Sequence, residues 1–250
     1  MDMKRVFIAF LSFMLLLSNF SCFSERGSVV IFSNLVGKNA FPLKGYKIGI
    51  DPGHQEKGNS ELEVVMPGSN ERKAKVASGT RGISTGIPEY KTVLEISLKL
   101  RDLLTELGAE VLMTRETHDV DISNMERALM MNEWGADLVL RMHLNGSTDS
   151  SVHGMGMYIR ASGDLVDKNT ALAEALLKHM SQATGAKKAG VFKRDTYTGL
   201  NWSEVPSVLV EMGYMTNPEE DEKLHSAEYQ EKLVIGAVNG ILEYLNVKTN

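Results

Sequence analysis

The chain has 250 residues, 43% of them hydrophobic and 24% charged, which excludes a mostly disordered chain, a collagen-like repeat and a multi-span membrane protein. Lysine and arginine total 27 against 32 acidic residues, a net charge of −5, so composition does not favour nucleic acid as a partner. The chain contains one cysteine and six histidines. Any metal must therefore be held by histidine and carboxylate side chains.

The N-terminus has a cationic patch at residues 4–5, an apolar run at 7–17 and then small polar residues. This layout is typical of a secretory signal, and the run is short for a transmembrane span. We expect residues 1–24 to be a signal peptide or membrane anchor and the protein to be exported to the cell exterior, the cell wall or the periplasm. An uncleaved anchor, lipidation at Cys22 and a buried N-terminal helix are the alternatives. Membrane contact is expected only through this segment.

Residues 25–45 are expected to form a linker, and residues 46–247 to form one catalytic domain. Its first strand is predicted at 47–51. Residues 52–88 are polar and glycine-rich, and no regular element is predicted there. A broad apolar stripe predicts a helix over 89–107, closed by Gly108.

Strands and helices alternate through the rest of the chain. Further strands are predicted at 109–114, 136–142, 154–160 and 207–211, and further helices at 124–134, 168–183 and 227–245. No linker, repeat or low-complexity segment interrupts this alternation. We therefore predict a single α/β domain with a mostly parallel twisted sheet and helices on both faces. Ligands of such sheets bind beyond the carboxyl ends of the strands.

Four side chains with suitable chemistry are expected at that edge. His54 follows the first strand, His143 and Glu211 lie at the ends of two others, and Glu89 lies in the first turn of a helix. Two histidines and one glutamate as ligands, with a second glutamate as base, form the set that a zinc hydrolase needs. Each residue also has an ordinary interpretation, as a surface or hydrogen-bonding side chain or, for Glu89, as a helix-start charge.

Several motifs occur in a fixed order along the chain. They are Asp-Pro-Gly-His at 51–54, Glu89, Met-Thr-Arg at 113–115, Glu-Arg-Ala at 126–128, Arg-Met-His-Leu-Asn at 141–145 and Pro-Ser-Val-Leu-Val-Glu-Met-Gly-Tyr-Met-Thr-Asn at 206–217. Over residues 46–247 the chain resembles the zinc-dependent N-acetylmuramoyl-L-alanine amidases of the bacterial cell wall, the amidase-3 family.

The resemblance implies a function and a site. His54, Glu89 and His143 would bind Zn²⁺, and Glu211 would be the catalytic base. The reaction would be hydrolysis of the amide between N-acetylmuramic acid and L-alanine in peptidoglycan muropeptides. A catalytically silent wall-binding or regulatory domain, and a zinc peptidase or deacylase with another substrate, are the alternatives. No wall-binding repeats are visible, which leaves room for an activator or targeting protein.

The chain departs from the family pattern in two places. Gln55 stands where the family commonly has glycine, and the segment between His54 and Glu89 is longer than usual. Long loops of this kind often form lids or substrate walls. The added length leaves other ligands open, with Glu95 as the fallback and with less favoured choices at Glu56, Glu61 and Glu63.

Other polar residues near the motifs are predicted to support the site. Arg141 and Asn145 are candidates to hold the oxyanion, with a structural role as the alternative. Arg115 and Arg127 are expected to brace the site, and Asp51 to orient a ligand or its turn. Trp202 is expected to pack in the fold, with stacking on the substrate as the alternative. Four histidines are expected to have solvated or capping roles: His118, His153, His179 and His225.

Overall fold

A six-stranded sheet in the order β4-β1-β5-β8-β6-β7 forms the centre of the computed structural model, which describes residues 41–247. Its strands are β1 (Lys47–Pro52), β4 (Glu110–Met113), β5 (Leu138–Asn145), β6 (Met155–Ile159), β7 (Lys188–Lys193) and β8 (Ser207–Tyr214). The pairs β1–β4, β1–β5, β5–β8 and β6–β7 are parallel, and β6–β8 is antiparallel. The predicted mostly parallel α/β sheet is confirmed.

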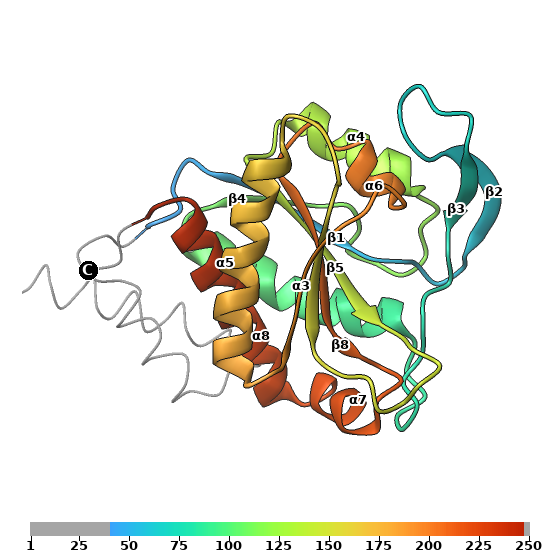
Figure 1. The fold of residues 1–250 in the computed structure, drawn as a ribbon. Coiled ribbons are helices and arrows are strands. Elements are labelled where there is room, and N and C mark those ends of the chain that lie inside the picture. The colour runs from blue at the N-terminus through green and yellow to red at the C-terminus, as the bar shows by residue number, and fades with distance from the viewer. Residues whose placement is uncertain (1–40, 248–250) are drawn as a thin grey trace, which may run out of the picture. The chain divides into compact units, whose positions relative to one another are not determined.

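Helices cover both faces of this sheet, as predicted. They are α3 (Glu89–Glu106), α4 (Asn124–Trp134), α5 (Val166–Thr184), α6 (Thr198–Asn201), α7 (Pro218–Leu224) and α8 (Ala227–Tyr244). Figure 1 shows α5 and α8 side by side along one side of the sheet, and α3 also packs against α8. On the other face, Met131 of α4 packs against Val139 of β5. Met131 also lies close to Gly49 of β1, because a Cβ added to Gly49 would lie 2.6 Å from Sδ of Met131.

The register of the strands decides which polar residues share the α4 face. Because side chains alternate along a strand, Arg141 and His143 lie on the same face of β5 as Val139. Arg141 is the partner of Asp51 in β1, and His143 is the partner of Glu211 in β8. Three neighbouring strands therefore bring these four polar side chains together near the carboxyl end of the sheet.

The expectation that residues 52–88 lack regular structure is wrong. β2 (Asn59–Val64) and β3 (Arg72–Val76) form a separate antiparallel hairpin. Most of its residues are exposed or half-buried, so the hydrophobic alternation that normally reveals a strand is weak. The edge strand β7 was missed for the same reason, because it begins and ends with exposed residues. The short helices α6 and α7 were also not predicted.

Two strands extend further than predicted, which changes where the site residues lie. β5 continues to Asn145 and β8 to Tyr214, so His143 and Glu211 lie within strands and not at their ends. The extended backbone fixes both side chains through ladder hydrogen bonds on either side.

The expected signal or anchor segment, residues 1–24, and most of the expected linker lie outside the described residues. Leu43 belongs to that expected linker, but it is fully buried and its N–H donates to the carbonyl of Leu107. Within residues 41–247, no helix combines the length and apolar character that crossing a bilayer requires.

Candidate metal centre

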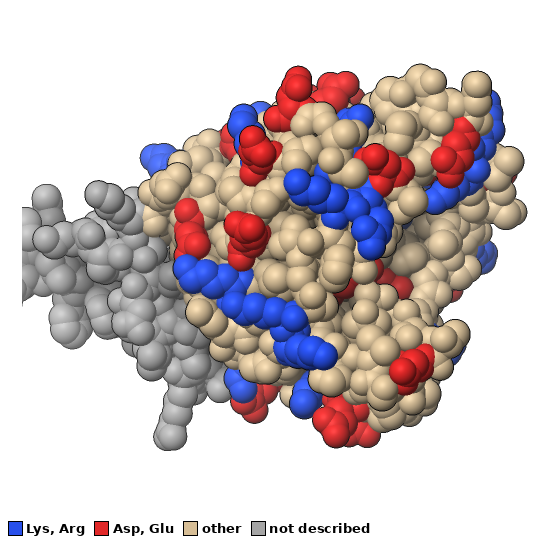
Figure 2. Space-filling model, in the orientation of Figure 1, with Lys and Arg blue, Asp and Glu red and all other residues tan. Residues whose placement is uncertain are grey.

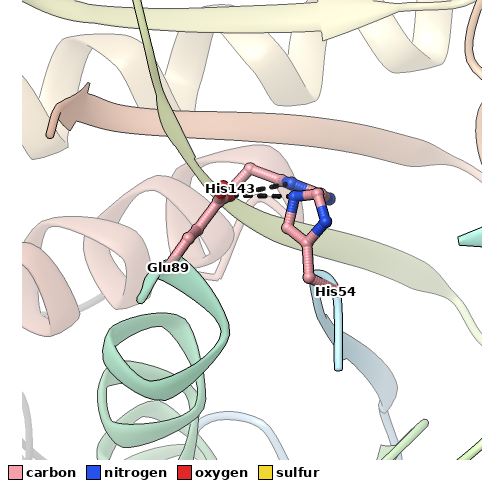
Figure 3. A group of neighbouring side chains, drawn as sticks. All are labelled: His54, Glu89 and His143. Atoms are coloured by element: carbon pink, nitrogen blue, oxygen red, sulfur yellow. Dashed lines mark hydrogen bonds and ion pairs between the residues drawn. The ribbon is translucent and has the colours of Figure 1, made fainter. Parts of the chain in front are cut away.

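Three side chains from three separate elements converge at the carboxyl end of the sheet (Figure 3). Nε2 of His54 and Nδ1 of His143 each lie 3.2 Å from Oε1 of Glu89. The two imidazole rings meet edge to face, with centroids 4.8 Å apart. One ligand atom from each residue lies within 4.8 Å of the others, the spacing of a group that could hold one metal ion.

His54 is held in an unusual backbone conformation. It follows the Pro-Gly turn after β1 and has a φ of 59°, in the left-handed region that non-glycine residues seldom adopt. Arg127 donates to its carbonyl, and its own Nδ1 lies 2.7 Å from the carbonyl of Ala77 at the exit of the hairpin. A Cβ on Gly53 would lie 2.3 Å from the ring of His143. Glycine is therefore the residue that lets the two histidines approach.

Glu89 is rigidly placed at the first position of α3. The residue is 2% exposed, and both carboxylate oxygens accept backbone hydrogen bonds at 2.9 Å, Oε2 from Thr80 and Oε1 from Leu144. The preceding loop is held by the buried carboxylate of Asp221 on α7, which accepts from the backbone N–H groups of Ser84 and Thr85. The carboxylate of Glu89 is therefore fixed from two directions, one at each oxygen.

The charges of the three residues depend on one another. Burial alone would raise the pKa of Glu89, but hydrogen bonds with His143 and His54 hold this pKa well below its usual range. Burial would lower the pKa of His54, but Glu89 outweighs burial and raises it. Burial prevails at His143, whose pKa is lowered. The site thus holds a carboxylate beside a neutral imidazole, the protonation states that a metal ligand needs.

The donor set has the features that a metal ion would complete. Since Nδ1 of His54 faces a carbonyl oxygen, it must donate, so Nε2 is the ring nitrogen that faces Oε1 of Glu89. A metal ion bound between these atoms would take the place of the proton in that hydrogen bond. Two imidazole nitrogens and one carboxylate oxygen suit a divalent transition metal and leave further positions open. His54, Glu89 and His143 therefore form a group that could hold one metal ion.

Glu211 lies beside this group with one oxygen unpaired. It is 8% exposed, and its Oε2 has no hydrogen-bond partner among residues 41–247. Burial and, next, the negative charge of Glu89 raise its pKa well above the usual value. Glu211 and the three metal-facing residues line one cleft of about 710 Å³. A strongly perturbed carboxyl group in a cleft marks a functional site.

A second group of polar residues lies next to the metal-facing group, and two of its members, Asp51 and Arg141, also line the cleft. Asp51 accepts from Arg127 at 2.9 Å, from Arg141 at 2.6 Å and from Thr114 at 2.6 Å. Arg115 donates to the carbonyls of Pro52, Gly53 and Tyr90. We call these five residues the support network, because they fix the turn that carries His54: Asp51, Thr114, Arg115, Arg127 and Arg141. All five side chains are buried.

The structure separates the remaining site candidates by position. Arg141 and Asn145 line the cleft, whereas Arg115 and Arg127 do not. Oδ1 of Asn145 accepts from the N–H of Gly146. Trp202 donates its indole N–H to the carbonyl of Val64, which ties α6 to the hairpin.

The fallback ligands lie elsewhere. Glu95 pairs with Lys99, Glu61 pairs with Lys75, and Glu63 accepts from the backbone of Met125. Glu56 lines a different pocket. The four other histidines also lie outside the metal group: His118, His153, His179 and His225.

Sequence reasoning missed the contacts that the hairpin segment supplies. Ala77 and Thr80 orient His54 and Glu89 through backbone atoms. Every residue type has these atoms, so the sequence gives no signal for such contacts. Gln55, the departure from the family pattern, is buried and accepts from Arg127 and from the N–H of Ile122. It joins the turn after His54 to the start of α4.

An α/β sheet with a His–Glu–His donor set and a buried carboxyl group beside it defines a metal-dependent hydrolase. Residues 48–243 match the model of the N-acetylmuramoyl-L-alanine amidase family, Amidase_3. The chain belongs to this family. The match extends from β1 to the last turn of α8. The family resemblance predicted from the sequence is confirmed.

Curated and solved relatives agree with this assignment. The N-acetylmuramoyl-L-alanine amidase Rv3717 of Mycobacterium tuberculosis is 29% identical over 219 residues, covering 81% of this chain and 88% of that protein. The crystal structure of the amidase Ami1 from Mycobacterium abscessus superposes with a TM-score of 0.74 at 26% identity, over 81% of this chain and 100% of that one. Ami1 from Mycobacterium smegmatis has the same fold, with a TM-score of 0.75 at 24% identity over 82% and 99% of the two chains.

Proposed function

We propose that this protein uses zinc to hydrolyse the amide between the lactyl group of N-acetylmuramic acid and L-alanine in peptidoglycan. The observation that carries the proposal is the common cleft of His54, Glu89, His143 and Glu211, in a chain of the amidase family. The ligands are Nε2 of His54, Nδ1 of His143 and the carboxylate of Glu89. Two nitrogens and one oxygen, with positions left open, are the donor set of catalytic zinc sites.

Each residue has a distinct part in the reaction. When bound, zinc supplies a Lewis acid and lowers the pKa of a coordinated water to about 7. Glu211 takes a proton from the attacking water and returns it to the nitrogen of L-alanine as the C–N bond breaks. Burial and Glu89 raise the proton affinity of Glu211, which suits a group that must hold a proton between these two steps. The support network keeps His54 in place throughout.

The cleft wall limits which substrates can enter. Lys73 and Ala74 of β3, with Gly79 and Thr80 of the following loop, line the cleft. The hairpin therefore forms part of the surface that a muropeptide would contact. On the face seen in Figure 2, lysine and arginine side chains lie interspersed with aspartates and glutamates. Such a surface offers no large field of one sign, so we propose that recognition is local to the cleft.

A peptidoglycan substrate requires action outside the cytoplasm. We propose that residues 1–24 provide an export signal or an anchor, and that the residues from there to about 40 connect it to the catalytic domain, since Leu43 already packs in that domain. The cationic patch and apolar run of the sequence support this assignment.

Product analysis tests the proposed function. Purified zinc-loaded protein is incubated with muropeptides of defined structure, and the products are separated by mass. Cleavage by an amidase leaves a free lactyl carboxylate on the sugar and a peptide that begins with L-alanine. Cleavage within the peptide would instead indicate a peptidase. Binding to sacculi without cleavage would indicate a silent wall-binding module.

A further inference from the structure

One tyrosine lines the catalytic cleft, and it has no role so far. Tyr197 directly precedes α6 and contributes to the same cleft as Glu211 and His143. Among residues 41–247, it is the one phenol in the cleft wall. Its neighbours in the wall, Thr196 and Thr198, lie on the same segment.

Tyr197 lies close enough to Glu211 for the carboxylate charge to change the pKa of the phenol. Burial and, next, the carboxylate of Glu211 raise the pKa of Tyr197 to about 12. The phenol is therefore protonated at any working pH of the enzyme. It can donate a hydrogen bond near the reacting atoms without becoming an ion.

The hydroxyl of Tyr197 is free to act on a substrate. No residue of the described range 41–247 forms a hydrogen bond with it. The ring, by contrast, is held firmly: it meets Tyr158 edge to face at 5.4 Å, and Tyr158 in turn packs on Phe192 at 5.1 Å. A rigid ring with an unpaired hydroxyl is a preorganised donor.

Hydrogen bonds from side chains to backbone carbonyls hold the segment that carries Tyr197 against the hairpin. Lys73 donates to the carbonyl of Thr196 at 3.0 Å. Asn201 donates to the carbonyls of Val65 and Asp195. The segment is thereby held at both ends against the hairpin and cannot drift from the cleft without breaking these bonds.

The other polar groups of the cleft are less suited to this role. Arg141 is 3% exposed and donates to Asp51 through Nη1, and its Nη2, which has no hydrogen-bond partner among residues 41–247, is itself buried. Lys73 donates to the carbonyl of Thr196.

We propose that Tyr197 is a catalytic residue whose hydroxyl donates a hydrogen bond to the oxygen of the scissile carbonyl as negative charge develops there. This inference rests on the proposed amidase function. As water adds to the carbonyl carbon, the electron pair of the C=O double bond moves to the oxygen. Tyr197 keeps its proton throughout and stabilises that charge. Glu211 carries the proton that reaches the leaving nitrogen.

The test compares Tyr197→Phe with Tyr158→Phe in zinc-loaded protein acting on a defined muropeptide. Tyr158→Phe removes a hydroxyl from the same aromatic cluster at a residue outside the cleft wall. Loss of one oxyanion donor lowers kcat by about 10²-fold or more. We expect that loss in Tyr197→Phe with KM, zinc content and melting temperature unchanged, and no such loss in Tyr158→Phe.

Each other outcome has a defined meaning. A kcat of Tyr197→Phe equal to that of wild type and of Tyr158→Phe overturns the inference. A raised KM with unchanged kcat also overturns it, because it assigns the hydroxyl to ground-state binding. Loss of zinc or a lowered melting temperature in Tyr197→Phe would overturn it in favour of a structural role. If wild-type protein cleaves nothing, the proposed function itself fails, an outcome distinct from the others.

Discussion

The metal centre and the support network lie next to each other at the carboxyl end of the sheet, but their buried charged groups differ in the partners that the chain provides. In the support network both oxygens of Asp51 have cationic partners, and the pKa of Asp51 is held well below its usual range despite burial. In the metal centre two histidines face one carboxylate oxygen, and Oε2 of Glu211 has no partner among the described residues. The first arrangement pairs both carboxylate oxygens of Asp51 with protein groups, although Nη2 of Arg141 has no hydrogen-bond partner among the described residues. The second leaves a donor set open for a cation and a substrate.

The difference in partners distinguishes residues that stabilise the fold from residues that take part in the reaction. A buried charge whose partners are all protein groups contributes to a rigid framework, and removing one partner leaves the others uncompensated. A buried charge without partners costs stability and is retained where function requires it. Mutations in the two regions should therefore change different measured quantities.

The largest stability effect is expected in the support network. Asp51→Asn keeps the side-chain shape but leaves Arg127 and Arg141 without a counter-charge, which should lower the free energy of unfolding by about 3–5 kcal/mol. Urea unfolding followed by circular dichroism measures this change. Glu228→Gln, which removes an exposed pair with Lys232, is the control and should be indistinguishable from wild type. Equal unfolding midpoints for all three proteins would show that the network is dispensable.

The same carboxylate predicts how stability depends on pH. Burial would raise the pKa of Asp51, but Arg127 and Arg141 lower it below the unfolded value of about 3.9. The native state then binds fewer protons than the unfolded state, so this stabilisation is present above about pH 4 and is lost as the pH falls further. The gap in unfolding midpoint between wild type and Asp51→Asn should narrow below that pH. A constant gap from neutral to acid conditions would contradict the assignment.

In the metal centre the expected change is in metal affinity. Glu89→Gln keeps the size of the side chain but removes its charge, and it should weaken zinc binding by more than about 100-fold, beyond the range typical of residues that only support a ligand. Competition with a zinc chelator measures this loss. Glu95→Gln on the same helix alters an exposed carboxylate paired with Lys99 and should bind zinc as wild type does. Equal weakening in both variants would point to helix damage instead of a lost ligand.

The smallest effect is expected at the start of α4, which carries Arg127. Ser123 and Glu126 form a capping box there, with the hydroxyl of Ser123 accepting from the N–H of Glu126. Ser123→Ala should cost about 1 kcal/mol of stability and leave zinc affinity unchanged. A large loss of zinc affinity in this variant would show that the two regions are coupled more tightly than their contacts indicate.

Residue patterns were sufficient to predict much of this architecture. Ser123 and Gly135 bracket α4 at the predicted bounds, because a side-chain cap and a left-handed glycine are local signals. The family resemblance carried by the motifs also implied that His54, Glu89 and His143 lie near one another. Local chemistry and strand periodicity sufficed for these features.

Other features depend on contacts between distant segments, and the sequence did not reveal them. The hairpin of β2 and β3 has no clear apolar alternation, and its contribution to His54 is a backbone carbonyl, that of Ala77. Tyr197 carries no motif, and its place in the cleft depends on bonds from Lys73 and Asn201 across the fold. Sequence-local signals do not report such long-range placement.

Zinc content and activity measured together in Glu211→Gln test the central claim most directly. Glu211 is assigned to proton transfer and not to metal binding. The variant should therefore hold one zinc per chain, like wild type, while amidase activity on muropeptides falls by about 10²- to 10⁴-fold, the range for loss of a general base. Activity equal to that of wild type, or absence of bound zinc from wild-type protein, would contradict the account.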